Sequence, residues 1–289
     1  MTRIIAIIAA CIAVAAQVRG EEKNISLWNS TPPASGVAPK SAPRTLTKRT
    51  DVPSLSFFAA KTSKPAPVII IAPGGGYNIL CDTYEGDDIA KMLNEWGISA
   101  CVLRYRVPND TVGALQDMRR AIRVVRERAK ELNIDPSKVG VFGSSAGANL
   151  CARVSANFKD ENYPARDDAD RLSARPDLAC LIYPAYCDEQ GRAKRFENAK
   201  PSGGSYDAKY ALAKDLNVSG ETPRAYIVQS YEDPYMNASV AYYLALREAG
   251  VPANLLLLDR GKHGFITSKN PYTDNWKTLL GAWLKANGF

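Results

Sequence analysis

Ser145 stands at the centre of a Gly-x-Ser-x-Gly sequence, which is the first candidate for chemistry in this chain. An apolar run begins before it at Val139 and a helical pattern follows it, so the serine would lie on a tight strand-to-helix turn. Such a turn exposes the hydroxyl above the edge of the sheet. The N–H of Ala146, at the start of the helix, would point to where a negatively charged oxygen forms. The pattern occurs often by chance, so a nucleophile also requires a base and an acid.

His263 is the only histidine in the chain, and it lies in a Gly-Lys-His-Gly sequence directly after the last expected strand. A serine hydroxyl is a poor nucleophile at neutral pH and needs such a base. A single histidine excludes zinc sites of the His-Glu-x-x-His type. A lone histidine is more often structural, but this one could reach across the sheet edge to Ser145. We therefore predict His263 as the general base.

Asp233 is the predicted third member, because it follows an expected strand thirty residues before His263. Its carboxylate would orient the imidazole and stabilise the protonated ring. Glu232 is adjacent, but the acid-proline pair favours a turn that directs Asp233 inward. Asp259 lies near His263 on the same strand end, which is too local to support the ring. The predicted triad is therefore Ser145, Asp233 and His263.

Three consecutive glycines follow a continuous β-branched strand pattern, within the segment Pro-Gly-Gly-Gly-Tyr at 73–77. Backbone without side chains between a core strand and a helix indicates close approach to another group. Beside a serine elbow, that group is most simply the oxygen of a substrate carbonyl. A flexible turn would explain the glycines but not their position in the chain.

Alternating strand and helix patterns predict an α/β fold, with a mostly parallel central sheet and helices on both faces. The segment 52–58 is expected to be an edge strand, and the arginine-rich outer face of the helix over 112–132 is expected to be solvated. Further strands are expected over 67–72, 98–105, 139–142, 178–183, 224–230 and 253–258, and further helices over 85–95, 237–248 and 276–284.

Residues 1–20 read as a signal peptide, with an apolar run from Ile4 to Ala16 and a mature chain that begins near Gln17. About thirteen apolar residues fall short of the ~20 that span a bilayer, so no membrane span is expected. Lipoprotein anchoring at Cys11 is disfavoured because the apolar run continues past it. The expected location is therefore secreted or periplasmic.

Residues 21–51 are polar and are expected to be a surface lead-in, followed by a single α/β domain over 52–289. Within it, residues 186–222 turn polar and form a candidate pocket-shaping insertion. The same stretch is equally compatible with a plain surface insertion.

Five cysteines follow the signal peptide, none of them in Cys-x-x-Cys spacing, and we expect packed thiols rather than metal ligands. The formal charge of +7 is scattered among nearly as many acids, so no nucleic-acid partner is expected. We expect no cofactor and no metal, and the sequence leaves the oligomeric state open.

The chain from Val52 to its end resembles the α/β-hydrolase serine esterases, in particular the acetylxylan-esterase-like branch related to hormone-sensitive lipases. The resemblance implies the same triad and an oxyanion hole formed by the N–H groups of Gly75, Gly76 and Ala146. Pro73 departs from the usual histidine before the glycines. The motifs that carry the resemblance are PGGGY, LRYRV, QDMRRAIRVVR, GSSAG, RPDLACLIYPAY, ALREAGVPA and GKHGF.

The resemblance predicts a secreted serine esterase that removes small acyl groups through an acyl-enzyme intermediate. The expected substrate is an O-acetyl ester of a polysaccharide or small carbohydrate, such as acetylated xylan. A general carboxylesterase, a prolyl-oligopeptidase-like exopeptidase and an inactive binding module remain alternatives. We expect no glycoside hydrolysis, because no pair of carboxylates is placed for it.

Overall fold

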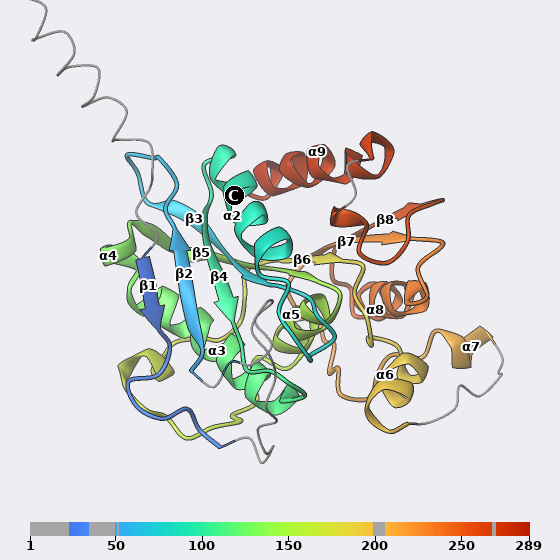
Figure 1. Ribbon diagram of the computed structural model, residues 1–289, viewed down its shortest axis with the longest axis horizontal. Coiled ribbons are helices and arrows are strands. Elements are labelled where there is room, and N and C mark those ends of the chain that lie inside the picture. The colour runs from blue at the N-terminus through green and yellow to red at the C-terminus, as the bar shows by residue number, and fades with distance from the viewer. Residues whose placement is uncertain (1–22, 35–49, 51, 199–205, 268–269) are drawn as a thin grey trace, which may run out of the picture.

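The computed structural model of the protein describes residues 23–34, 50, 52–198, 206–267 and 270–289. The expected signal peptide, residues 1–20, lies outside the described residues. The described strands form one sheet in the order β1-β2-β4-β3-β5-β6-β7-β8 (Figure 1). They are β1 (Lys23–Ser26), β2 (Ser54–Phe58), β3 (Ala66–Ala72), β4 (Ser99–Arg104), β5 (Ile134–Ser144), β6 (Ala179–Ile182), β7 (Ala225–Ser230) and β8 (Ala253–Leu258).

The pairings from β4 through β8 are parallel, while β2 runs antiparallel to both β1 and β4. Helices cover both faces of this sheet, which confirms the predicted fold class. The helices are α2 (Asp88–Glu95), α3 (Thr111–Glu127), α4 (Ala129–Leu132), α5 (Ala146–Ala156), α6 (Glu189–Phe196), α7 (Tyr206–Lys209), α8 (Met236–Glu248) and α9 (Pro271–Ala286), with a π-helical turn η1 (Thr83–Asp87) and 3-10 helices η2 (Asp168–Arg171) and η3 (Phe265–Thr267).

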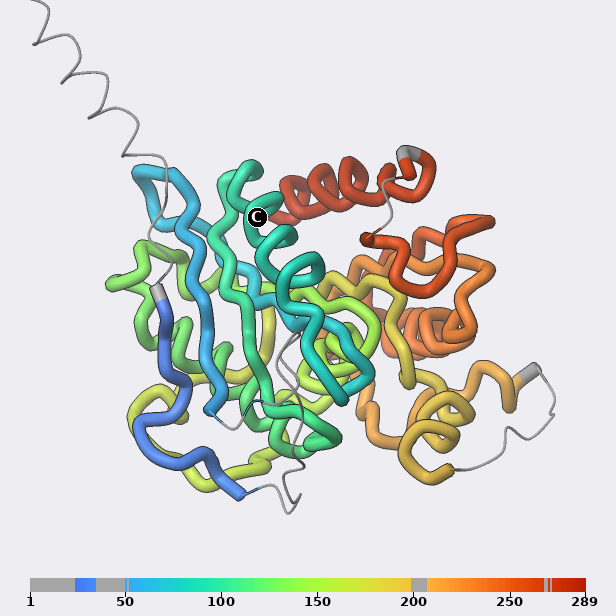
Figure 2. The backbone as a smooth tube through the Cα atoms, viewed as in Figure 1, coloured from blue at the N-terminus to red at the C-terminus, as the bar shows by residue number. Residues whose placement is uncertain are grey.

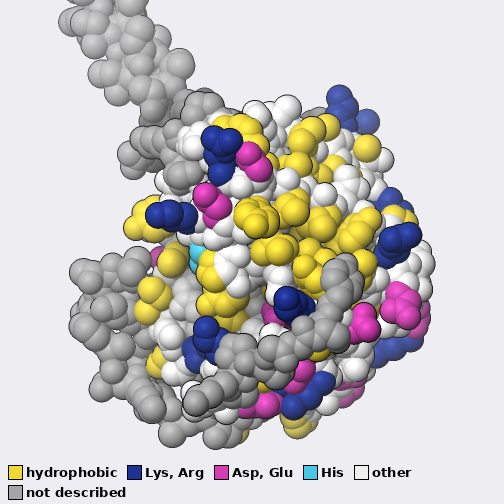
Figure 3. Space-filling model, turned by 90° about the vertical axis from the view of Figure 1, so that its right-hand side faces the viewer, with side chains coloured by type: hydrophobic (Ala, Val, Ile, Leu, Met, Phe, Trp, Pro, Cys, Tyr) yellow, Lys and Arg dark blue, Asp and Glu magenta, His cyan; other side chains and the backbone are white. Residues whose placement is uncertain are grey.

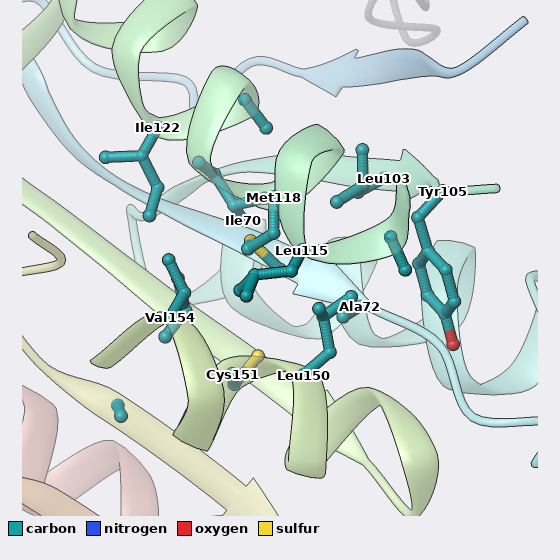
Figure 4. Packing of buried hydrophobic residues seen from close by; sticks show 14 of the residues in the cluster. Ile70, Ala72, Leu103, Tyr105, Leu115, Met118, Ile122, Leu150, Cys151 and Val154 are labelled. Atoms are coloured by element: carbon teal, nitrogen blue, oxygen red, sulfur yellow. The ribbon is translucent and has the colours of Figure 1, made fainter. Parts of the chain in front are cut away.

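Alternate residues of β3 face opposite layers, because successive side chains of a strand point to opposite sides. Ile70 packs with residues of α3 and α5, including Met118 and Leu150 (Figure 4). Ile69 and Ile71 belong to the other core, which α2 and α9 cover. Burial on both faces explains the continuous β-branched sequence of this strand.

Helices α2 and α9 lie side by side although they come from distant parts of the chain (Figure 2). A Cβ placed on Gly281 of α9 would lie 3.5 Å from the indole ring of Trp96, which ends α2. The last helix thus closes the second layer, and it begins five residues earlier than the sequence pattern predicted.

β2 was expected at the edge of the sheet, but β1 pairs with it and takes the edge position, with Ile25 opposite Leu55. Ile25, Leu27 and Trp28 are buried in the core. The polar lead-in of residues 21–51 therefore contributes a strand and core side chains, and the fold begins before residue 52. A four-residue strand among polar residues has too little alternation to be recognised.

The prediction of a solvated arginine face on the long helix was wrong. Arg119, Arg120 and Arg123 of α3 are buried under the segment that contains η2. Arg120 pairs with Asp170 at 3.0 Å, and their side chains are 2% and 1% exposed. Buried guanidinium groups persist because this segment supplies carboxylates and hydroxyls to them. The helix also ends at Glu127, and α4 follows as a separate turn.

The four cysteines at 101, 151, 180 and 187 are buried free thiols, as expected, and Cys81 is half-buried. Within the described ranges, no helix is long and apolar enough to cross a bilayer.

Candidate active site

Ser145 lies between the end of β5 and the start of α5, with φ 53° and ψ −120°. A residue with a side chain rarely adopts this backbone conformation, and the packing around Ser145 holds the residue in it. The two flanking glycines are required sterically. A Cβ on Gly143 would lie 2.4 Å from the carbonyl oxygen of Gly147, and a Cβ on Gly147 would lie 2.0 Å from that of Ala72. The turn therefore brings three backbone segments together around the serine.

His263 and Asp233 lie next to Ser145, each on a loop that follows a strand. The Ser145 Oγ is 2.8 Å from Nε2 of His263, and Nδ1 of His263 is 2.7 Å from Oδ2 of Asp233. The Asp233 side chain is fully buried, whereas the His263 side chain is 29% exposed and reaches the surface (Figure 3). This arrangement allows the ring to accept the serine proton on one side while a carboxylate orients it on the other.

The two alternative acids point elsewhere. Glu232 accepts a hydrogen bond of 2.9 Å from the backbone N–H of Gly261 and so supports the loop that carries His263. Asp259 is exposed, where it pairs with Arg260 at 3.0 Å and also contacts Tyr272. Of the three acids that the sequence offered, only Asp233 contacts the histidine ring.

The glycine loop passes directly beside the serine, since a Cβ on Gly74 would lie 3.0 Å from Cβ of Ser145. Gly75 and Gly76 have φ of 132° and 63°, which favour glycine. Within the described part of the chain, their N–H groups donate to no backbone carbonyl. Ala146 is the first residue of α5, so its N–H has no acceptor within the helix. Ala146 and the loop that carries Gly75 and Gly76 therefore adjoin Ser145, while the role of their N–H groups stays a prediction.

Three side chains anchor this loop, and sequence reasoning assigned none of them a role. Glu85 accepts from the N–H of Gly74 at 2.7 Å, and Tyr105 donates to the carbonyl of Pro73 at 2.6 Å. Arg195 of α6 donates to the carbonyl of Gly76 at 2.7 Å. The sequence offered only Tyr105, within the motif LRYRV, and Glu85, at the start of the helix expected over 85–95, and neither signal identifies a loop anchor.

Glu85 is buried and also accepts a hydrogen bond of 2.7 Å from the hydroxyl of Tyr183. Burial raises the pKa of this carboxyl above its ordinary value, against the two hydrogen bonds that lower it. The ring of Tyr183 lies edge-on to His263, with 5.1 Å between the ring centroids. Glu85 thus connects the glycine loop with Tyr183, the side chain that packs against His263.

The insertion over 186–222 lies close to the triad, which favours the first of its two interpretations. It contains α6 and α7, which lie outside the two helical layers (Figure 1). Phe196 packs against Tyr77 of the glycine loop at 6.1 Å between centroids and against Tyr186 at 5.4 Å. Tyr186 packs on Tyr235, whose ring lies 4.9 Å from His263. Edge-to-face aromatic contacts therefore connect the insertion with the glycine loop and with His263.

Comparisons with known proteins agree with this architecture. A family model described as alpha/beta hydrolase fold matches residues 69–267. An acetylxylan esterase from Xylanibacter ruminicola is 30% identical over 233 residues, which is 75% of this chain and 45% of that protein. An endo-1,4-beta-xylanase B from Butyrivibrio fibrisolvens is 28% identical over 238 residues, which is 78% of this chain and 36% of that protein. The chain thus spans less than half the length of each of these two relatives.

A solved structure matches over nearly its whole length. It is the acetyl ester-xyloside bifunctional hydrolase from Caldicellulosiruptor lactoaceticus, which is 30% identical to this chain with a TM-score of 0.76. The match covers 94% of this chain and 99% of that one.

Proposed function

The chain belongs to the α/β hydrolase family, and from this we propose that it is a serine esterase whose catalytic residues are Ser145, Asp233 and His263. The observation that carries the proposal is the continuous hydrogen-bonded series of these side chains beside a glycine loop. The distances are 2.8 Å from serine to histidine and 2.7 Å from histidine to aspartate. Hydrogen-bond contact between nucleophile, base and orienting acid is what acyl transfer requires.

The reaction has two halves. Ser145 attacks the ester carbonyl while Nε2 of His263 takes the hydroxyl proton, and Asp233 stabilises the resulting imidazolium. The N–H groups of Gly75, Gly76 and Ala146 stabilise the oxyanion of the tetrahedral intermediate. The intermediate collapses, the proton passes from His263 to the leaving alcohol, and the acyl group stays on the serine. Water activated by the same histidine then releases the acid.

We propose a small acyl group, most simply acetyl, on a carbohydrate such as acetylated xylan. Two findings support this choice: a relative is named acetylxylan esterase, and a structural neighbour of similar length is named acetyl ester-xyloside bifunctional hydrolase. The insertion over 186–222 also contributes polar side chains, among them Arg195, Lys194 and Gln190, to a cavity next to the loop that carries Asp233. A cavity that combines these polar groups with the rings of Tyr186 and Tyr235 suits a sugar better than a long aliphatic chain.

We also propose that the protein is exported, to the periplasm or the medium. The proposal is supported by the apolar run of residues 4–16, which directly follows Arg3. N-terminal sequencing of protein recovered outside the cytoplasm tests this, with a start near Gln17 expected. A retained Met1 would contradict the proposal.

The test of function is acetate release from acetylated xylan by the purified protein, with Ser145→Ala as the matched control. We expect release from the wild-type protein and a loss of at least about a thousandfold in the variant. p-Nitrophenyl acetate and p-nitrophenyl palmitate, assayed in parallel, test the preference for a short acyl group. Hydrolysis of the palmitate ester alone would contradict the proposed preference for a short acyl group. Full activity of Ser145→Ala would contradict the assignment of Ser145 as the nucleophile.

A further inference from the structure

A cavity of about 330 Å³ lies between α6 and the loop that carries Asp233. Its volume is at the lower end of the ~300–1,000 Å³ of small-molecule sites, which suits a single ring. Among the residues that line it are Tyr186, Asp188, Gln190, Lys194, Arg195 and Tyr235.

Two tyrosines connect this cavity with the reacting groups. The ring of Tyr235 lies 4.9 Å from that of His263. The hydroxyl of Tyr186 lies 3.9 Å from the position of a Cβ on Gly76, in the glycine loop. Their own rings meet edge-on at 5.2 Å. A group held against this wall is therefore close to both the histidine and the predicted oxyanion donors.

The position next to His263 identifies which half of the ester the cavity would hold. In serine acyl transfer, the histidine returns its proton to the leaving oxygen. The alcohol half must therefore lie on the histidine side of the carbonyl carbon. Tyr235, two residues after Asp233, lines that side.

The accessible charges of the cavity are cationic. Arg195 donates to neutral oxygens, those of Gly76 at 2.7 Å and of the Asn109 side chain at 2.9 Å. Within the described residues, no carboxylate pairs with Arg195 or with the exposed Lys194. Asp188 is buried and accepts the N–H of Gly191 at 2.8 Å, as the N-cap of α6. Guanidinium and ammonium groups left without an acid favour an anionic ligand.

We propose that this cavity is the alcohol-side subsite, and that it selects esters whose sugar carries a carboxylate. The tyrosines form the wall against which the sugar ring packs, while Lys194 and Arg195 attract the carboxylate. This inference rests on the proposed esterase function and makes it narrower, because it names an acidic sugar as the preferred alcohol.

The test uses two substrates that differ only at C6, a mono-O-acetyl methyl glucoside with a hydroxymethyl group there and the matching acetylated methyl glucuronoside with a carboxylate. We expect wild-type kcat/KM to be about fivefold higher for the glucuronoside at low salt. Lys194→Gln should lower this ratio about threefold, and Lys194→Glu should lower it further, since one exposed charge pair contributes about this much. Added salt should lower the ratio in the wild-type protein.

Lys130→Gln is the matched control, because this exposed lysine of α4 precedes β5 whereas Ser145 follows the other end of that strand. It should leave the ratio unchanged. Equal kcat/KM for both glycosides, or a preference that both Lys194 variants retain, would overturn the inference and leave the esterase function in place. Turnover of neither glycoside would overturn the inference as well, and p-nitrophenyl acetate then decides whether esterase function itself survives.

Discussion

The carboxylate of Glu85 accepts a hydrogen bond from the N–H of Gly74 and another from the hydroxyl of Tyr183, each 2.7 Å long. Gly74 begins the glycine loop beside Ser145, and Tyr183 packs against His263. One buried side chain therefore positions both the predicted oxyanion donors and the predicted base. This makes Glu85 a positioning residue rather than a reacting one.

Replacing Glu85 with alanine should lower kcat by about ten- to a hundredfold with little change in KM. The N–H of Gly74 would lose its acceptor, and a shifted loop forfeits part of the roughly hundredfold contribution of an oxyanion donor. Glu85→Gln keeps an acceptor oxygen and should recover most of this loss. Steady-state kinetics on p-nitrophenyl acetate measures both effects. Wild-type kcat in the alanine variant would contradict the positioning role.

The thiol of Cys81 should alkylate slowly near neutral pH. Burial, followed by the negative charges of Glu85 and Asp82, raises its pKa to about 11. A raised thiol pKa lowers the thiolate fraction, which would be about one in a thousand at pH 8. Iodoacetamide labelling followed by mass spectrometry should therefore accelerate about tenfold per pH unit between pH 8 and 10.

Glu85→Gln should accelerate the labelling of Cys81 at pH 8, because it removes a neighbouring negative charge. In the Cys81→Ser variant, any label that remains comes from other cysteines. A labelling rate that levels off near pH 9 would show that the thiol pKa is ordinary.

Glycine at position 145 should give a more stable protein than alanine, by about 1 kcal/mol, while both variants lose activity. At most positions glycine is roughly 0.5–1 kcal/mol less favourable than alanine. Here the φ of 53° strains any residue with a Cβ, by about 1–3 kcal/mol, and glycine avoids this strain. Urea unfolding of Ser145→Gly and Ser145→Ala measures the difference. An alanine variant that is the more stable of the two would contradict backbone strain at this position.

Arg120→Ala should reduce the free energy of unfolding by about 3–5 kcal/mol. The substitution removes the shortest ion pair of the Asp170 carboxylate, which is 1% exposed, and leaves Arg123, at 3.7 Å, to compensate its charge. Arg171→Ala is the control, because that side chain is 82% exposed on the same segment and, among the described residues, its ion pair is with exposed Asp168. We expect it to change stability by less than about 0.5 kcal/mol. Equal effects of the two variants would show that burial of the pair is unimportant.

The sequence by itself determined the features that depend on local pattern. β-Branched runs and apolar periodicity predicted the parallel strands and most helices, because burial on one or two faces leaves a direct trace in residue order. The Gly-Ser-Ser-Ala-Gly elbow, the single His263 and Asp233 after a strand predicted which side chains would converge. Parallel strands bring their following loops to one edge, so chain order was sufficient to propose the triad.

The tertiary structure alone decided which groups are partners across long separations. The arginines of α3 look like a solvated face in sequence, and only the packing of residues 160–171 over this helix supplies the carboxylates that pair with them. The lead-in yields β1 only because β2 offers an unpaired edge. Glu85 reaches Gly74 and Tyr183 through a turn whose direction no periodicity encodes. Local patterns report whether a side chain prefers burial, whereas the chain's full path selects its neighbours.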